Sequence, residues 1–224
     1  MCGRFTIITP IEKLIEQFEA DLLEEDLKGT LFPNYNAAPG QKLLVITNTA
    51  PRQISLYRWG LIPYWAKDPA IGYKLINARS ETITEKSAFK NAFKKRRCII
   101  LADSYFEWEK KGAKKIPYRI LMKNDKPFAM AGIWETWKNT EGKEVYSFSI
   151  ITTEANSLTK DIHDRMPCIL DKKKIKMWLD TNIPEPAALQ LLKPYPNAEM
   201  KLYEVSTLVN SPKNNSPQII EPVK

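Results

Sequence analysis

The residue with the most distinctive chemistry in this sequence is Cys2, which directly follows the initiator methionine. A small second residue favours removal of Met1, and Cys2 would then carry a free α-amine beside its thiol. With reference pKa values of ~7.7–8.0 for the amine and ~8.5 for the thiol, part of the amine is unprotonated at neutral pH. Such an aminothiol condenses with an aldehyde to an imine, and the thiol then closes a five-membered thiazolidine ring. A cysteine at position 2 can also be accidental, so this chemistry needs support from other residues.

Two further side chains could move protons. His163 is the only histidine, and it lies between two apolar segments and beside Arg165, which suits a proton carrier near an anion. Glu107 lies among Tyr105, Phe106 and Trp108, where desolvation should raise the pKa of its carboxyl group. The alternatives are a structural or surface histidine and a glutamate on the solvent face of a strand.

Asn77 and Arg79 could position a substrate. The amide of Asn77 can orient a carbonyl or hydroxyl group, and the guanidinium of Arg79 can clamp a phosphate. The alternative interpretation is a turn asparagine followed by a salt-bridged arginine.

The other two cysteines, Cys98 and Cys168, adjoin apolar residues and are predicted to be small buried side chains. Three widely spaced cysteines do not form a disulfide framework, which favours a reducing compartment. A zinc site of these cysteines with His163 would lack the usual ligand spacing. The sequence has no Gly-rich phosphate loop or dinucleotide fingerprint, so we expect neither a metal nor a cofactor.

Composition favours a folded protein with an anionic partner. The 224 residues carry a formal net charge of +8, from 34 Lys and Arg against 26 Asp and Glu. This surplus favours nucleic acid only weakly, since many basic proteins bind none. The N-terminus lacks the layout of a signal peptide, and no apolar run approaches the ~20 residues of a membrane span. We therefore expect a cytoplasmic protein with no membrane contact.

The elements that must position these residues are mostly strands. Alternation and apolar runs predict strands at 5–8, 43–46, 54–59, 98–109, 118–122, 128–137 and 146–152. Periodicity predicts a helix that begins at Pro10, with an apolar stripe from Ile11 to Leu23, and helices at 87–97, 154–161, 172–179 and 186–192. Residues 34–40 are predicted to form a polar loop. Because the strands follow one another at hairpin length, we expect an α+β fold with a mainly antiparallel, curved sheet. One domain should span residues 1–210, with an irregular tail, 211–224, docked on it.

Six segments, taken together, resemble one family. They are residues 1–5 (MCGRF), 35–39 (YNAAP), 58–63 (RWGLIP), 76–82 (INARSET), 106–108 (FEW) and 163–167 (HDRMP). In this order they resemble the SOS response-associated peptidase (SRAP) family, the abasic-site processing proteins. Each segment alone is weak, whereas six in register are highly specific.

The resemblance implies a barrel-like β core with flanking helices and a covalent capture reaction. It implies that Cys2, freed of Met1, links to the ring-opened aldehyde of an abasic site in single-stranded DNA. By resemblance, Asn77 positions the sugar or the Cys2 amine, and Glu107 and His163 assist ring opening and imine chemistry. The resemblance further assigns DNA binding to Arg4, Pro39, Trp65, Arg79, Trp108 and Arg165, with the tryptophans against bases and the arginines on phosphates.

Physical reasoning agrees with this function but leaves other functions open. An abasic site offers no base to recognise, so a basic groove with aromatic platforms could hold the strand without regard to sequence. We expect a monomer that is nucleoid-associated when bound to DNA, with peptidase-like self-processing and chemically possible DNA lyase activity. The alternatives are a cysteine peptidase or amidohydrolase with Cys2 as nucleophile, and a non-covalent single-stranded DNA-binding module.

Overall fold

The computed structural model describes residues 2–22 and 31–223. Met1, and Leu23 of the predicted helical stripe, lie outside the described residues, so removal of Met1 stays a prediction. The strands are β1 (Arg4–Ile7), β2 (Asn34–Ala37), β3 (Lys42–Thr47), β4 (Ala50–Trp59), β5 (Asn77–Arg79), β6 (Arg97–Ala102), β7 (Ser104–Lys111), β8 (Lys114–Met122), β9 (Phe128–Lys138), β10 (Glu144–Glu154), β11 (Arg165–Pro167), β12 (Ile169–Leu170) and β13 (Met200–Glu204). The α-helices are α1 (Ile11–Phe18), α2 (Lys90–Lys95), α3 (Lys172–Leu179) and α4 (Glu185–Gln190), and 3-10 turns include η2 (Pro69–Lys74), η3 (Ser80–Thr82), η5 (Thr207–Asn210) and η6 (Pro217–Ile220).

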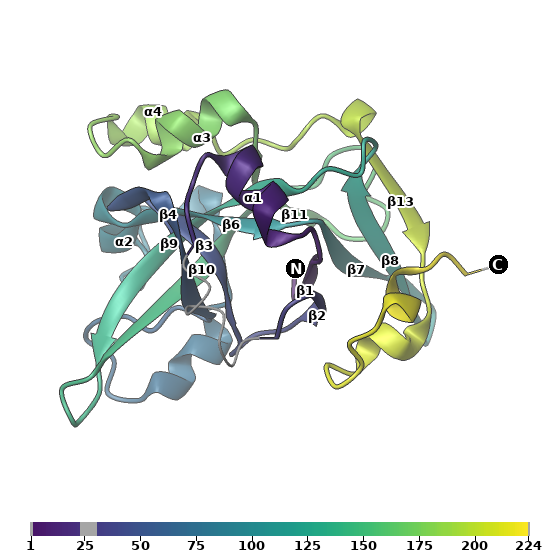
Figure 1. Cartoon of the computed structure of the whole chain (residues 1–224), viewed down its shortest axis with the longest axis horizontal. Helices are drawn as coiled ribbons and strands as arrows, with labels where there is room; N and C mark the ends of the chain where they lie inside the picture. Colours follow the sequence, from purple (N-terminus) through teal and green to yellow (C-terminus); the bar gives the residue numbers. More distant parts are fainter. Residues whose placement is uncertain (1, 23–30, 224) are drawn as a thin grey trace.

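Five strands close into a barrel. They pair in the order β10-β4-β3-β6-β9, and β9 pairs with β10 to complete the ring (Figure 1). All of these pairings are antiparallel except β10 with β4, and β5 also pairs with β10 in parallel. The prediction of a single α+β domain with a mainly antiparallel, barrel-like core is confirmed.

A second sheet, in the order β13-β8-β7-β1-β2, carries the N-terminal strand. Side chains alternate between its two faces, as the pleat requires. One face, with Phe5 and Tyr105, joins the main core, whereas the other, with Phe106, packs in a smaller cluster against Val205, Val209 and Ile219. The alternation therefore decides which residues of β1 and β7 can reach Cys2.

The C-terminal residues cover this outer face of the second sheet. Asn36 of β2 donates through Nδ2 to the carbonyl oxygens of Val209, Ser211 and Asn214 at 3.2, 3.0 and 2.9 Å. Figure 1 shows the same segment beside β8 and β13. One buried amide thus fastens the end of the chain to the strand next to β1.

The predicted helices agree with the structure unevenly. The helix predicted at 172–179 is confirmed by α3, whose first turn is capped by Asp171, and α4 lies within one or two residues of the predicted 186–192. Helix α1 ends at Phe18 because Glu19 adopts a left-handed conformation at φ 53°, so the stripe does not continue to Leu22. Helix α2 is shorter than the predicted 87–97 because Arg97 already pairs with Ile133 in the barrel.

Three other predictions were wrong, each because a polar side chain hydrogen-bonds within the protein in a way that the sequence does not reveal. Residues 34–37 form β2 rather than a loop, since the buried amides of Asn34 and Asn36 find partners inside the protein. The strand predicted at 98–109 is two strands, broken at Asp103, whose carboxylate accepts the N–H groups of Ile8 and Thr9. The helix predicted at 154–161 is the end of β10 and a turn held by Asn156.

Candidate active site

Cys2 lies immediately before β1, and its side chain is fully buried. Asn77, the first residue of β5, donates through Nδ2 to the Cys2 carbonyl oxygen at 2.9 Å. The Oδ1 atom of Asn77 is buried and has no hydrogen-bond partner among residues 2–22 and 31–223. A buried amide oxygen without a donor costs about 1–3 kcal/mol, so this atom is an acceptor available to an N–H group beside Cys2.

Glu107 of β7 is only 4 % exposed, and burial raises the pKa of its carboxyl group to about 7. The charge of Asp164 acts in the same direction. Burial also raises the pKa of the Cys2 thiol well above its usual range, and the nearby charge of Glu107 adds to this effect. At neutral pH Glu107 is therefore populated in both protonation states, whereas Cys2 is a neutral thiol. The predicted desolvation of Glu107 is confirmed.

Tyr105 is a neighbour of this site that the sequence analysis missed. It precedes Glu107 by two residues on β7, so both side chains project from the same face. Tyr105 is fully buried, and its pKa is raised first by that burial and then by the charges of Cys2 and Glu107. An aromatic residue in a strand gives no signal beyond core packing, and only the pairing of β1 with β7 places it here.

His163 lies in the turn before β11, beside the same site. Its Nδ1 accepts the N–H of Arg165 at 2.9 Å and lies 2.8 Å from Oδ1 of Asp164. Burial lowers the pKa of the imidazole, while Asp164 opposes that shift. The N–H of Arg165 needs a bare Nδ1, whereas a hydrogen bond to Asp164 needs a proton on Nδ1, so these two contacts favour different protonation states of the ring.

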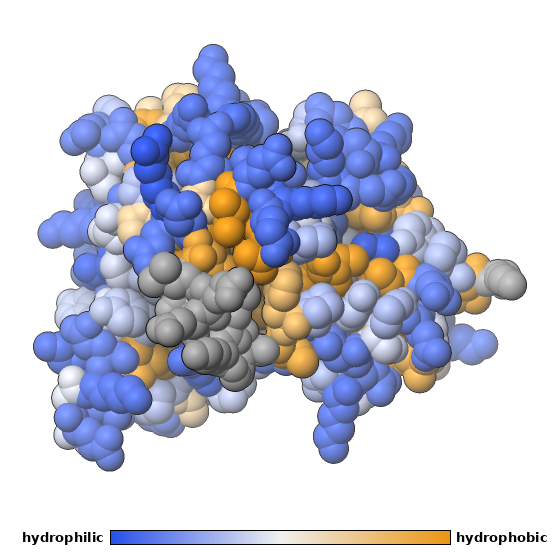
Figure 2. Space-filling model, in the orientation of Figure 1, coloured by the Kyte–Doolittle hydropathy of each residue, from blue (hydrophilic) through white to orange (hydrophobic). Residues whose placement is uncertain are grey.

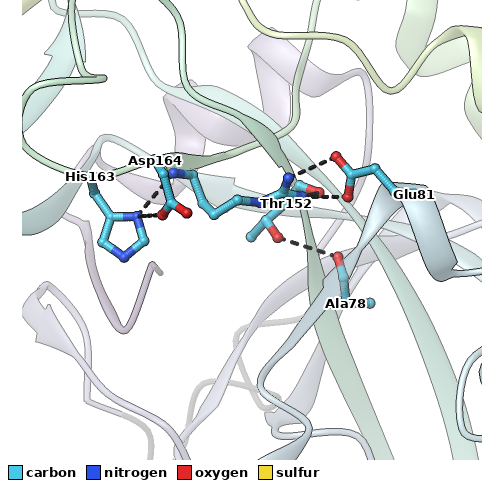
Figure 3. Close-up of polar contacts among 6 residues, drawn as sticks. Ala78, Glu81, Thr152, His163 and Asp164 are labelled. Atoms are coloured by element: carbon cyan, nitrogen blue, oxygen red, sulfur yellow. Dashed lines mark hydrogen bonds and ion pairs between the residues drawn. The ribbon is translucent and has the colours of Figure 1, made fainter.

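Arg165 forms an ion pair with Glu81. Its Nη1 and Nη2 donate to the two carboxylate oxygens of Glu81 at 2.7 and 2.8 Å, and Nη2 also donates to the carbonyl of Thr152 at 2.6 Å (Figure 3). This bidentate pair lowers the pKa of Glu81. In this structure the guanidinium therefore fixes the turn that carries His163, and its role as a phosphate ligand stays a prediction.

Arg4 and Trp108 lie on the outer face of the second sheet. Arg4 donates to Asn36 Oδ1 and to the carbonyl of Val209, both at 2.8 Å, and the indole N–H of Trp108 donates to Asn210 Oδ1 at 2.7 Å. Both side chains thus hold the C-terminal segment against β1 and β7. Their predicted DNA contacts stay predictions.

The remaining predicted DNA-binding residues are accessible. Arg79, at the end of β5, is exposed and has no ion pair within the described part of the chain. Trp65 is 48 % exposed, in a loop fastened by a hydrogen bond of 2.7 Å from the Trp137 indole N–H to the carbonyl of Ala66. Pro39 is half-buried in the turn after β2.

The predicted burial of Cys98 and Cys168 is confirmed. No group of three or more His, Cys, Asp or Glu side chains among residues 2–22 and 31–223 could hold a metal ion. Over the same residues, no helix is long and apolar enough to cross a membrane.

The raised pKa of Glu107 should make the free energy of unfolding depend on pH. Its pKa is 4.5 in an unperturbed chain and about 7 in the folded protein, so folding favours the protonated form. The contribution of Glu107 to the free energy of unfolding is fully present below about pH 4.5 and is lost as pH rises through 7. We expect Glu107→Gln to gain up to about 3 kcal/mol relative to wild type between pH 5 and pH 8, measured by urea denaturation. The exposed Glu204→Gln is the control, and an equal pH response in all three proteins would contradict the shift.

Comparisons with known proteins agree on one family. A family model described as SOS response associated peptidase (SRAP) matches residues 1–212. The abasic site processing protein YoqW of Bacillus subtilis is 49 % identical over 99 % of both chains. The abasic site processing protein HMCES of Xenopus tropicalis is 34 % identical over 83 % of this chain and 65 % of its own length. A crystal structure of a Bacteroides thetaiotaomicron protein superposes with a TM-score of 0.92 at 32 % identity, covering all of both chains.

Proposed function

Because this chain belongs to the SOS response associated peptidase family, we propose that it processes abasic sites by capturing them covalently in single-stranded DNA through Cys2. The observation that carries the proposal is the arrangement around that residue. The Asn77 amide holds the Cys2 carbonyl at 2.9 Å, next to a buried Glu107 with a pKa of about 7. Few other reactions need an N-terminal aminothiol beside a group that can both give and accept a proton.

The amine of Cys2 acts first, after Met1 has been removed. Burial keeps the thiol protonated, so the thiol is the weaker nucleophile at neutral pH. The α-amine has a reference pKa of ~7.7–8.0 and is partly neutral there. The Oδ1 of Asn77, which has no partner within the described part of the chain, is suited to accept one N–H of this amine and so to aim its lone pair at the substrate. The same site would perform the self-processing that removes Met1.

The reaction joins the two partners with loss of one water. In the abasic sugar the hydroxyl proton on C1′ moves to the ring oxygen, the C1′–O4′ bond breaks, and an aldehyde forms. The amine adds to this aldehyde to give a carbinolamine, and Glu107 protonates the departing hydroxyl group as the imine forms. The thiol then adds to the imine carbon, its proton passes to nitrogen, and the thiazolidine is complete. His163 transfers the proton of ring opening.

The DNA strand is held by Arg79 and Trp65 in this proposal. Arg79 is exposed and without an ion pair within the described residues, so its full charge is available to a phosphate. Trp65 offers an exposed ring that can stack on a base for about 1–3 kcal/mol.

We expect Arg79→Ala to weaken binding of single-stranded DNA and to flatten its salt dependence. Loss of one phosphate contact should reduce the slope of log K against log salt by about 0.7. Fluorescence anisotropy titrations over a range of salt concentrations measure this slope. Lys114→Ala, at the exposed start of β8, is the control, and an unchanged slope for Arg79→Ala would remove Arg79 from the phosphate contacts.

Two other functions use the same residues. A cysteine peptidase would use the Cys2 thiolate, but burial and the charge of Glu107 disfavour that ion. A passive DNA-binding module would give Cys2 and Glu107 no role. A denaturing gel separates covalent capture from both alternatives: the purified protein should shift an abasic oligonucleotide and leave an undamaged one unshifted. Without a shifted band, in protein shown to lack Met1, covalent capture would be rejected.

A further inference from the structure

A cavity of about 850 Å³ lies apart from the Cys2 site. It is formed by the end of α1, the start of β4, the turn between β8 and β9, the strand β12, α3, and the segment before β13. Its lining includes none of Cys2, Asn77, Glu107 or His163. The volume is within the ~300–1,000 Å³ of sites that bind drug-sized ligands, so a short peptide segment fits it.

The floor of this cavity is apolar. Met122, Phe128, Ile169 and Leu179 are buried beneath it, and Ile175 of α3 is half-buried at its side. On the face that carries α1, Figure 2 shows apolar surface at the centre, bordered by hydrophilic side chains. Such a floor favours an occupant with aliphatic or aromatic side chains.

The carboxylates at the rim of the cavity already have partners. Glu19 pairs with Lys172, and Asp171 accepts the N–H of Lys174 at 2.8 Å as the cap of α3. Asp180 accepts the N–H of Asn182 at 2.8 Å, and Glu199 accepts the Tyr195 hydroxyl at 2.9 Å. Each rim carboxylate thus has at least one partner within the protein, although a carboxylate can accept more than one hydrogen bond.

Four cations at the rim lack a direct ion-pair partner in the described ranges. They are Arg52, Lys123, Lys126 and Lys176, which line the cavity and are exposed. With Lys172 the rim carries five cations against four carboxylates, and the charges of Lys176 and Arg52 also act on Glu19. The remaining surplus of positive charge around an apolar floor favours a ligand that is apolar and acidic.

We propose that this cavity is a docking site for a short acidic, amphipathic peptide segment of a partner protein. Its leucine or phenylalanine side chains occupy the apolar floor, and its carboxylates pair with Lys126 and Lys176 at the rim. Because the lining excludes the Cys2 site, peptide and DNA bind at the same time. The partner could thus bring this protein to damaged DNA without competing for its active site.

The test uses a fluorescein-labelled hexapeptide that alternates aspartate with leucine or phenylalanine, titrated with the full chain in anisotropy measurements. We expect saturable binding that weakens about tenfold or more in the double variant Lys126→Glu, Lys176→Glu, since two attractions become repulsions. The control double variant Lys114→Glu, Lys143→Glu has the same change in net charge and should bind as wild type does. Lys114 begins β8 and Lys143 lies in the turn between β9 and β10, both outside the cavity.

Four results would overturn the proposal. The first three are absence of saturable binding, equal binding by the two double variants, and equal binding of a peptide with asparagine in place of aspartate. The fourth is self-association that the rim variant abolishes, which would assign the cavity to a second copy of this chain. Sedimentation velocity measures the last. Capture of an abasic oligonucleotide should be unchanged in the rim variant, so failure of this proposal is distinct from failure of the proposed function.

Discussion

Glu107→Gln is expected to slow covalent capture of an abasic oligonucleotide by about 10²–10⁴, the usual range for loss of a general acid–base. The amide fills the same buried position but has no proton to give to the departing hydroxyl of the carbinolamine. The rate is measured from quenched time points on denaturing gels. Glu109→Gln, two residues further along β7 and paired with the exposed Lys111, is the matched control and should react at the wild-type rate.

The same substitution should change the pH profile. Wild-type capture needs a neutral amine, favoured above ~7.7–8.0, and a protonated Glu107, favoured below about 7, so its rate should pass through a maximum between these values. Glu107→Gln should lose the alkaline limb and level off at high pH. A profile of unchanged shape in the variant would exclude Glu107 as the acid.

Cys2→Ala is expected to abolish the adduct that survives denaturation. The variant keeps an N-terminal amine once Met1 is removed, so it can form an imine, but it has no thiol to close the ring. The open imine should hydrolyse or allow β-elimination, which nicked abasic DNA would reveal. Cys2→Ser should give a weaker, more reversible product because a hydroxyl group is a poorer nucleophile. The measurement is the yield of shifted band after denaturation.

Both Cys2 variants must retain non-covalent DNA binding, measured by anisotropy with an undamaged strand, for the comparison to hold. The buried thiol donates only a weak contact of 3.8 Å to the carbonyl of Arg4, so its loss should disturb the fold little. An equal yield of stable adduct from Cys2→Ala would exclude thiazolidine formation.

The chemistry of the candidate site could be predicted from residue types, because it depends on local features. An N-terminal cysteine, a lone histidine and a glutamate among aromatic residues are visible in the sequence, and the burial of Glu107 agrees with that interpretation. Four of the five barrel strands follow alternation and apolar runs and were predicted within four residues, whereas β6 was predicted without its end at Ala102.

The arrangement of partners could not be predicted, because it depends on pairings between distant segments. The bidentate contact of Arg165 with Glu81 joins residues 84 positions apart, and Arg4 contacts Val209 across 205 positions. Whether a strand residue faces Cys2 or the C-terminal segment depends on the register of β1 with β7, where Phe5 pairs with Tyr105. A shift by one residue would exchange Glu107 and Trp108 between the two faces.

The most direct test of covalent capture by Cys2 is the intact mass of the protein after reaction with an abasic single-stranded oligonucleotide. We predict one species with the mass of the protein lacking Met1 plus the oligonucleotide minus one water, and peptide mapping should place the link on Cys2. An adduct on a chain that retains Met1, or a link mapped to a lysine, would contradict the account.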